Sequence, residues 1–230
     1  MVKQSSVPNT ESGRKWADPF IGILFFLCLV AIGLGIALNF RPLYYLCIRW
    51  FDIEAQSGFS KSVIKENYNA LIDYCSPFFT GALKFPSLAA SESGLSHFAE
   101  VKVIFNVIYI AGFVSALIVI PVLIHRIRSG NARILRTCSV TSVIIPVIFL
   151  IFCLIDFDRL FLLFHKLAFN NDDWLFDPDT DPVITILPES FFMVCGIVIA
   201  AVILLGALFS FLAYRKLRSG NGKSRGDSAR

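Results

Sequence analysis

The chain has 230 residues, of which 56% are hydrophobic and 17% are charged. Soluble domains are roughly 45–50% apolar and about 25% charged, so this composition, with a mean hydropathy of +0.69, excludes a water-soluble globule. The net charge of +4 does not indicate nucleic-acid binding, because the basic residues cluster just outside the apolar segments, where they set membrane orientation.

Four apolar segments are long enough to cross a bilayer as helices, which takes about 20 residues each. The first is too long for the 7–15-residue core of a signal peptide, so we expect an uncleaved span. The expected segments are 1–18 (cytoplasmic tail), 19–40 (first span), 41–102 (extracytoplasmic loop), 103–124 (second span), 125–136 (cytoplasmic loop), 137–155 (third span), 156–188 (extracytoplasmic loop), 189–212 (fourth span) and 213–230 (basic cytoplasmic tail).

Basic residues decide the orientation of these spans. The short loop at 125–136 contains four arginines and no acid, which is typical of a cytoplasmic loop. The sequence therefore predicts an all-α membrane protein with four transmembrane helices, both termini in the cytoplasm and an extracytoplasmic cap formed by two loops. The low-complexity stretch at 219–230 is expected to be disordered.

Two of the three histidines lie near the outer ends of spans. His97 precedes the second span and His165 follows the third, so both belong to one leaflet. Glu100 falls at i+3 from His97 and Asp158 lies two helical turns before His165, which suggests that acids orient the rings for proton transfer. His125 sits in the basic loop and is interpreted as a solvated side chain.

Other chemistries leave weaker signals. His97, His165 and either Asp172 or Asp173 remain an alternative metal site of the two-histidine, one-carboxylate kind, but no metal or cofactor is predicted. The sequence has no G-x-S-x-G elbow and no cysteine beside a histidine, so a covalent serine or cysteine cycle is not indicated. Whether Cys47 and Cys75, both in outward segments, form a disulfide stays open.

Several motifs resemble the lipoprotein intramolecular transacylases, a bacterial membrane family known as Lit. The resemblance covers nearly the whole chain, including the four-span layout. The matching residues are Asn67-Tyr68-Asn69 with Tyr74, then Ser96-His97-Phe98-Ala99-Glu100-Val101-Lys102, and finally Phe164-His165, Asn171-Asp172-Asp173-Trp174, Asp177-Pro178-Asp179-Thr180-Asp181 and Leu187-Pro188-Glu189-Ser190-Phe191-Phe192.

The resemblance implies an enzyme of the bacterial cell membrane with its active site on the extracytoplasmic side. Such an enzyme moves the sn-2 acyl chain of a diacylglyceryl lipoprotein onto the α-amine of its N-terminal Cys, giving a lyso-form lipoprotein. The implied partners are this substrate and membrane lipid, with no nucleic acid. The resemblance implies His97 and His165 as catalytic residues, and the supporting or substrate-binding residues would be Glu100, Tyr68, Asn69, Asn171 and Asp172.

Two positions depart from the family pattern. Glu100 stands where the family commonly has Asp, which keeps a carboxylate, and Asp173 stands where an apolar residue is usual, so Asp173 is a poorer candidate than its neighbours. A non-enzymatic four-helix membrane scaffold or lipoprotein-binding protein remains the alternative. In that alternative Gln or Asn would replace the histidines without loss of function.

Overall fold

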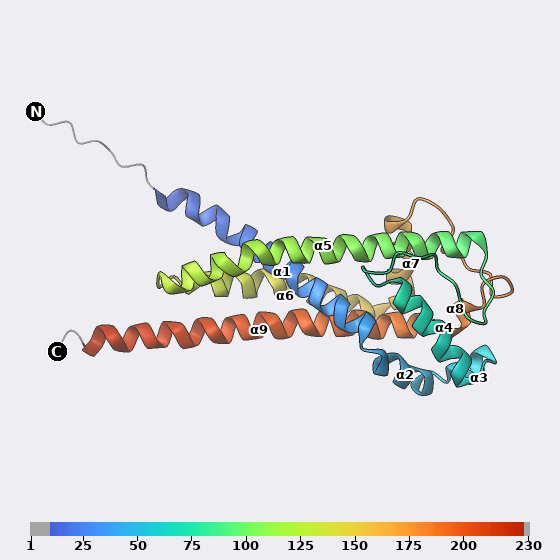
Figure 1. The fold of residues 1–230 in the computed structure, drawn as a ribbon. Coiled ribbons are helices and arrows are strands. Elements are labelled where there is room, and N and C mark those ends of the chain that lie inside the picture. Colours follow the sequence, from blue (N-terminus) through green and yellow to red (C-terminus); the bar gives the residue numbers. More distant parts are fainter. Residues whose placement is uncertain (1–9, 228–230) are drawn as a thin grey trace, which may run out of the picture.

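The structure is a computed structural model that describes residues 10–227. These residues form helices and loops without a strand. Four long helices run side by side (Figure 1), and each is long and apolar enough to cross a membrane. They are α1 (Thr10–Asn39), α5 (Glu92–Arg128), α6 (Arg133–Ile155) and α9 (Glu189–Asp227). The predicted four-helix membrane fold is therefore confirmed.

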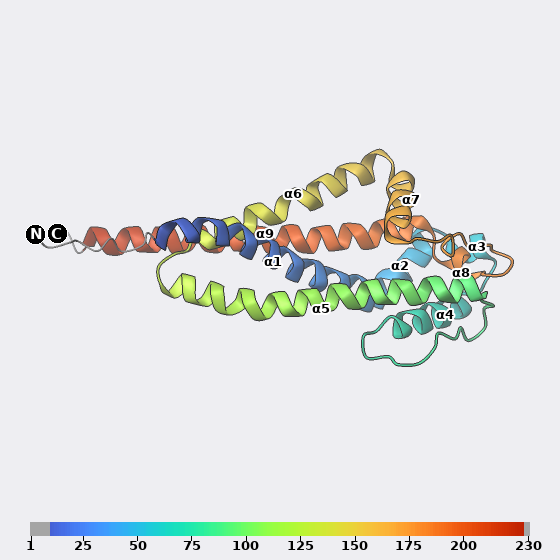
Figure 2. The ribbon, with the colours of Figure 1, turned by 90° about the horizontal axis from the view of Figure 1, so that it is seen from above.

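The remaining helices gather at one end of the bundle (Figure 1), where together with their loops they form what we call the cap. Seen from above, α7 lies across the direction of the long helices (Figure 2). The cap helices are α2 (Arg41–Trp50), α3 (Ile53–Ser57), α4 (Lys61–Tyr74), α7 (Phe157–Ala168) and α8 (Val183–Ile186).

The long helices extend well beyond the apolar stretches in the sequence. Helix α5 has 37 residues and so measures about 55 Å, whereas the hydrocarbon core of a bilayer is about 30 Å thick. Its first turns therefore project past the span into the cap. The expectation of disorder at 219–230 is wrong up to Asp227, because α9 continues to that residue; 228–230 lie outside the described residues.

Helix α1 lies at the centre of the bundle and contacts α5, α6 and α9. Because lipid tails are as apolar as the helices, association in a bilayer depends on close packing at small residues. A Cβ atom added at Gly33 would lie 3.0 Å from the Ile199 Cα atom and 3.3 Å from its carbonyl oxygen. The α1–α9 crossing thus depends on the absence of a side chain at Gly33.

Inside the cap, aromatic rings join α2 and α4 to α9. Tyr44 and Tyr68 stack with ring centroids 3.6 Å apart, and the Phe191 ring meets the Tyr44 ring edge-on at 4.9 Å. The Tyr44 hydroxyl donates a hydrogen bond to the Ile186 carbonyl oxygen at 2.6 Å, which satisfies a buried polar group. The six cysteines are free thiols, so the structure has no Cys47–Cys75 disulfide.

We expect Gly33→Ala to destabilise the protein, because the added methyl group meets the backbone of α9 and that backbone cannot rotate away. Overpacking of this kind typically costs about 1–3 kcal/mol. Gly35→Ala is the matched control, since its Cβ would meet only Tyr109 Cε1 at an ordinary 3.7 Å. Thermal unfolding in detergent should show a lower Tm for Gly33→Ala alone; equal Tm values for the two variants would contradict this packing.

Candidate active site

A cavity of about 180 Å³ lies where the cap meets the bundle. Its wall is almost entirely apolar, and the polar side chains that line it are few: two histidines, a tyrosine, a tryptophan and two cysteines. Helices α1, α4, α5, α7, α8 and α9 and the loop after α7 contribute to it. Representative lining residues are Tyr68, His97, Phe105, His165, Trp174 and Phe192.

His97 lies in the second turn of α5, and the start of that helix is fixed by two caps. The Ser91 hydroxyl accepts a hydrogen bond from Gly94 N at 2.9 Å, and the buried Asp181 carboxylate accepts one from Ser91 N at 2.8 Å. A Cβ at Gly94 would lie 2.3 Å from Asp181 Oδ1. The loop before α8 therefore packs directly against the start of α5, one turn before His97.

His165 lies in the last turn of α7. Its Nδ1 atom is 2.8 Å from the carbonyl oxygen of Phe161. A carbonyl oxygen only accepts hydrogen bonds, so Nδ1 carries the proton in the neutral ring and Nε2 is the free basic nitrogen. Asp158, two turns earlier on this helix, makes no hydrogen bond to the ring. The expectation that an acid orients the His165 ring is therefore wrong, because a backbone carbonyl orients it instead.

The two histidine rings meet although 68 positions separate them in the sequence. Their centroids are 5.8 Å apart, and the Phe169 ring contacts both, at 4.7 Å from His97 and 5.6 Å from His165. Only 4% of His97 and 8% of His165 is exposed. The structure thus brings together the two candidate catalytic residues in one apolar cavity.

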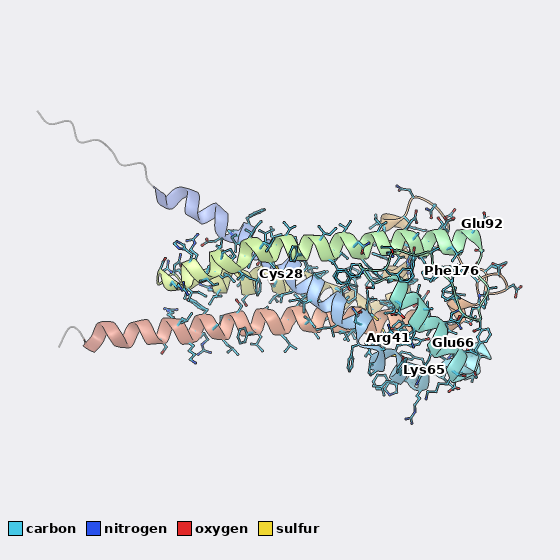
Figure 3. The ribbon with its side chains drawn as sticks, in the orientation of Figure 1. Cys28, Arg41, Lys65, Glu66, Glu92 and Phe176 are labelled. Atoms are coloured by element: carbon cyan, nitrogen blue, oxygen red, sulfur yellow. The ribbon has the colours of Figure 1, made fainter. Side chains whose placement is uncertain are left out.

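Aromatic rings complete the enclosure of this pair. Phe161 and Trp174 lie 4.2 and 5.1 Å from the His165 ring, and Phe176 lies 5.4 Å from the His97 ring. Figure 3 shows Phe176 beside the first turns of α5. Sequence reasoning missed Phe161 and Phe176, because nothing in a chain with 23 Phe distinguishes a phenylalanine that lines a cavity from one that faces lipid. Trp174 is named only as part of a matching motif, without a role.

Enclosure keeps both imidazoles neutral. His97 precedes the membrane-spanning part of α5, and burial, reinforced by the neighbouring His165, lowers the pKa of His97 from 6.5 to about 4. The charge of Asp173 acts in the opposite direction. Burial also lowers the pKa of His165, against the hydrogen bond to Phe161, which favours the protonated ring. Low polarity disfavours the charged form of a histidine, so both rings are neutral at pH 7.

Glu100 does not orient the His97 ring as expected from its i+3 spacing. The structure contains no hydrogen bond between the two, and Glu100 Oε1 accepts one from Asn171 Nδ2 at 2.8 Å. The Asn171 carbonyl oxygen in turn accepts a hydrogen bond from Trp174 Nε1 at 3.0 Å. Glu100 and Asn171 therefore fasten the loop that places Trp174 against His165.

Of the other residues implied by the resemblance, one lines the cavity and two do not. Tyr68 lines the cavity, and burial raises the pKa of its hydroxyl, which therefore stays protonated. Asn69 is not part of the cavity wall; its side-chain oxygen accepts a hydrogen bond from the Tyr45 hydroxyl at 2.9 Å. Asp172 is exposed at the surface. Among residues 18–219, whose side chains the structure describes, no group of three or more His, Cys, Asp or Glu is arranged to hold a metal ion.

Comparisons with known proteins identify the family and similar solved structures. The family model described as lipoprotein intramolecular transacylase Lit matches residues 20–192. The membrane-integral Lit of Bacillus cereus is 33% identical with a TM-score of 0.86, covering 91% of this chain and 99% of its own. Comparison with curated protein sequences gave no match.

Two further structures of the Bacillus cereus protein also match. In one a histidine is replaced by arginine (32% identity, TM-score 0.81, covering 93% of this chain and 97% of its own), and in the other by alanine (32%, 0.82, covering 94% and 100%). The family match covers well over half of the chain and the structural match nearly all of it. The chain belongs to the lipoprotein intramolecular transacylase family, Lit.

Proposed function

We propose that this membrane-embedded transacylase uses His97 and His165 to move the sn-2 acyl chain of a diacylglyceryl lipoprotein onto the α-amine of its own N-terminal Cys. The product is a lyso-form lipoprotein. The observation that carries this proposal is the pair of neutral, buried imidazoles 5.8 Å apart in an apolar cavity. The lipoprotein is the only reactant required, and it brings both the nucleophile and the ester.

The reaction needs the net transfer of one proton, from the amine nitrogen to the glyceryl oxygen. The amine nitrogen attacks the ester carbonyl carbon, an N–C bond forms and the carbonyl oxygen becomes an oxyanion. A histidine takes the proton that the nitrogen loses, and the C–O bond to the glyceryl oxygen breaks. The glyceryl oxygen then receives a proton from the histidine pair, so the enzyme returns to its starting state.

The low polarity of the cavity favours the neutral form of the substrate amine as well as that of the histidines. A free α-ammonium has a pKa of about 7.7–8.0, and desolvation lowers that value for the same reason that it lowers the pKa of the histidines. The amine therefore reaches the ester uncharged and nucleophilic. Holding amine and ester in contact is worth up to about 7–11 kcal/mol in favourable intramolecular reactions.

Tyr68 is our candidate donor to the oxyanion. It lines the same cavity, its ring is held by the stack on Tyr44, and its protonated hydroxyl is free to donate a hydrogen bond. Donors placed at a developing oxyanion commonly contribute 10²–10³-fold in rate. Glu100 and Asn171 act on the position of Trp174 and take no part in proton transfer.

We expect His97→Ala and His165→Ala each to lower the transfer rate by about 10²–10⁴, the usual contribution of general acid–base catalysis. Tyr68→Phe should lower it by about 10²–10³, and Glu100→Gln by less, since Gln keeps an oxygen that can accept from Asn171. Mass spectrometry of the N-terminal peptide of a reporter lipoprotein measures the transfer. His125→Ala, at the far end of α5, is the control. Full activity of His97→Ala or His165→Ala at normal expression would show that the proposed site is wrong.

The lowered pKa values predict where the histidines titrate. Below its pKa a histidine is charged and above it neutral, so the His97 ring signals should keep their neutral position from pH 8 down to about pH 5 and change only near pH 4. Carbon-13 NMR of labelled imidazole rings checks this. Asp173→Asn should lower the His97 pKa further, because it removes a negative charge; a midpoint near 6.5 in the intact protein would contradict the desolvated site.

The proposed orientation places the cap and the active site on the extracytoplasmic side, following the basic residues at the opposite end of the bundle. Cysteine labelling tests it in a chain whose native cysteines are replaced. A membrane-impermeant maleimide should label Asp177→Cys in intact cells and should label Ser129→Cys only after the membrane is opened; both positions are exposed. The reverse pattern would invert the orientation.

A further inference from the structure

A second cavity, of about 390 Å³, lies at the end of the bundle opposite the cap. It opens where α6 begins and is bounded by α1 and α9, the two helices that pack most closely against α6. None of the residues that line it belongs to the active-site cavity. Its lining residues include Asp18, Arg133, Arg136, Thr137, Val140 and Tyr214.

The charges around this cavity are positive overall. Its one acid, Asp18, accepts a hydrogen bond from Arg126 Nη2 at 2.7 Å, and the two side chains are only 23% and 11% exposed. The Asp18 charge is thus neutralised by a neighbour outside the cavity wall. Arg133 and Arg136 have no carboxylate partner within 18–219, the range over which the structure describes side chains, so their two charges are uncompensated by any of these residues.

A helix start adds to this positive potential. Arg133 and Arg136 lie in the first turn of α6, and the residue before it, Ala132, provides no side-chain cap. The free N–H groups and dipole of a helix N-terminus attract anions. A group carrying negative charge would satisfy this end of the cavity.

Polarity changes along the cavity in the direction of the membrane. The α6 residues recur every three to four positions and share one face of the helix, in the order Arg133, Arg136, Thr137, Val140. Val140 lies four residues beyond Arg136, about 6 Å along the axis, and is 54% exposed. The headgroup layer of one leaflet is about 5–7 Å thick. The cavity wall thus changes from cationic to apolar over the thickness of a lipid headgroup layer.

We propose that this cavity binds an anionic phospholipid of the leaflet at this end of the bundle, which is the cytoplasmic leaflet in the proposed orientation. The phosphodiester lies between Arg133 and Arg136, the Thr137 and Tyr214 hydroxyls face the headgroup, and the acyl chains run past Val140 into the bilayer. Basic cavities between helices at this depth suit lipid headgroups. A free phosphate would use the arginines but would leave Val140 without a partner.

The test measures lipid retention by the full-length protein. Protein purified from mixed phosphatidylglycerol and phosphatidylcholine vesicles is examined by native mass spectrometry for the lipids that stay bound. The expected result is retained phosphatidylglycerol, with a preference over phosphatidylcholine that falls about thirtyfold in the double variant Arg133→Gln/Arg136→Gln. Val140→Asp should also weaken retention, because a charge then meets the acyl chains.

The control removes the same charge from the same end of the bundle outside the cavity. Arg128→Gln/Arg215→Gln should keep the preference, since both side chains are exposed and neither lines the cavity. Three results would overturn the proposal: an unchanged preference in Arg133→Gln/Arg136→Gln, an equal loss in the control, or displacement of the lipid by excess inorganic phosphate. The last would identify a site for a free anion instead. Acyl transfer is not part of the readout, so this test is independent of the proposed reaction.

Discussion

The burial of one pair of imidazole rings is the constraint on which the proposed active site depends. Two protonated rings 5.8 Å apart would repel each other in an environment with little screening. The aromatic enclosure prevents protonation, and it also gives the acyl chains of a lipid substrate an apolar surface to contact. The same low polarity that suits the substrate therefore keeps the histidines in the form that accepts a proton.

Polar contacts around the edge of the cavity hold this apolar centre in place. Asp181 fixes the start of α5, while Glu100 and Asn171 fasten the loop that carries Trp174. None of the three lines the cavity. The projection of α5 beyond the bilayer and the crosswise direction of α7 bring histidines from two distant segments to the same depth. The two rings of the proposed site are thus positioned by residues that do not line the cavity.

Hydropathy predicted the four spans well, because a stretch that must lie in hydrocarbon has little freedom of composition. It also placed both histidines near one end of the bundle. It did not predict the partners of the rings. Helical spacing suggested Glu100 and Asp158, but spacing shows only which residues share a helix face. Whether a side chain turns to its own helix, as His165 does toward Phe161, or to a distant loop, as Glu100 does toward Asn171, depends on tertiary packing.

The most direct test of this account is a crossover experiment, because the central claim is that amine and ester belong to one substrate molecule while the enzyme only encloses them and transfers a proton. Two reporter lipoproteins with different peptides, one carrying an isotopically labelled sn-2 chain, are processed together by the purified protein in phospholipid of a third isotopic composition. Mass spectrometry of the N-terminal peptides should find each amide-linked chain on the peptide that originally carried it. Exchange of label between the peptides, or a chain drawn from the phospholipid, would contradict the account.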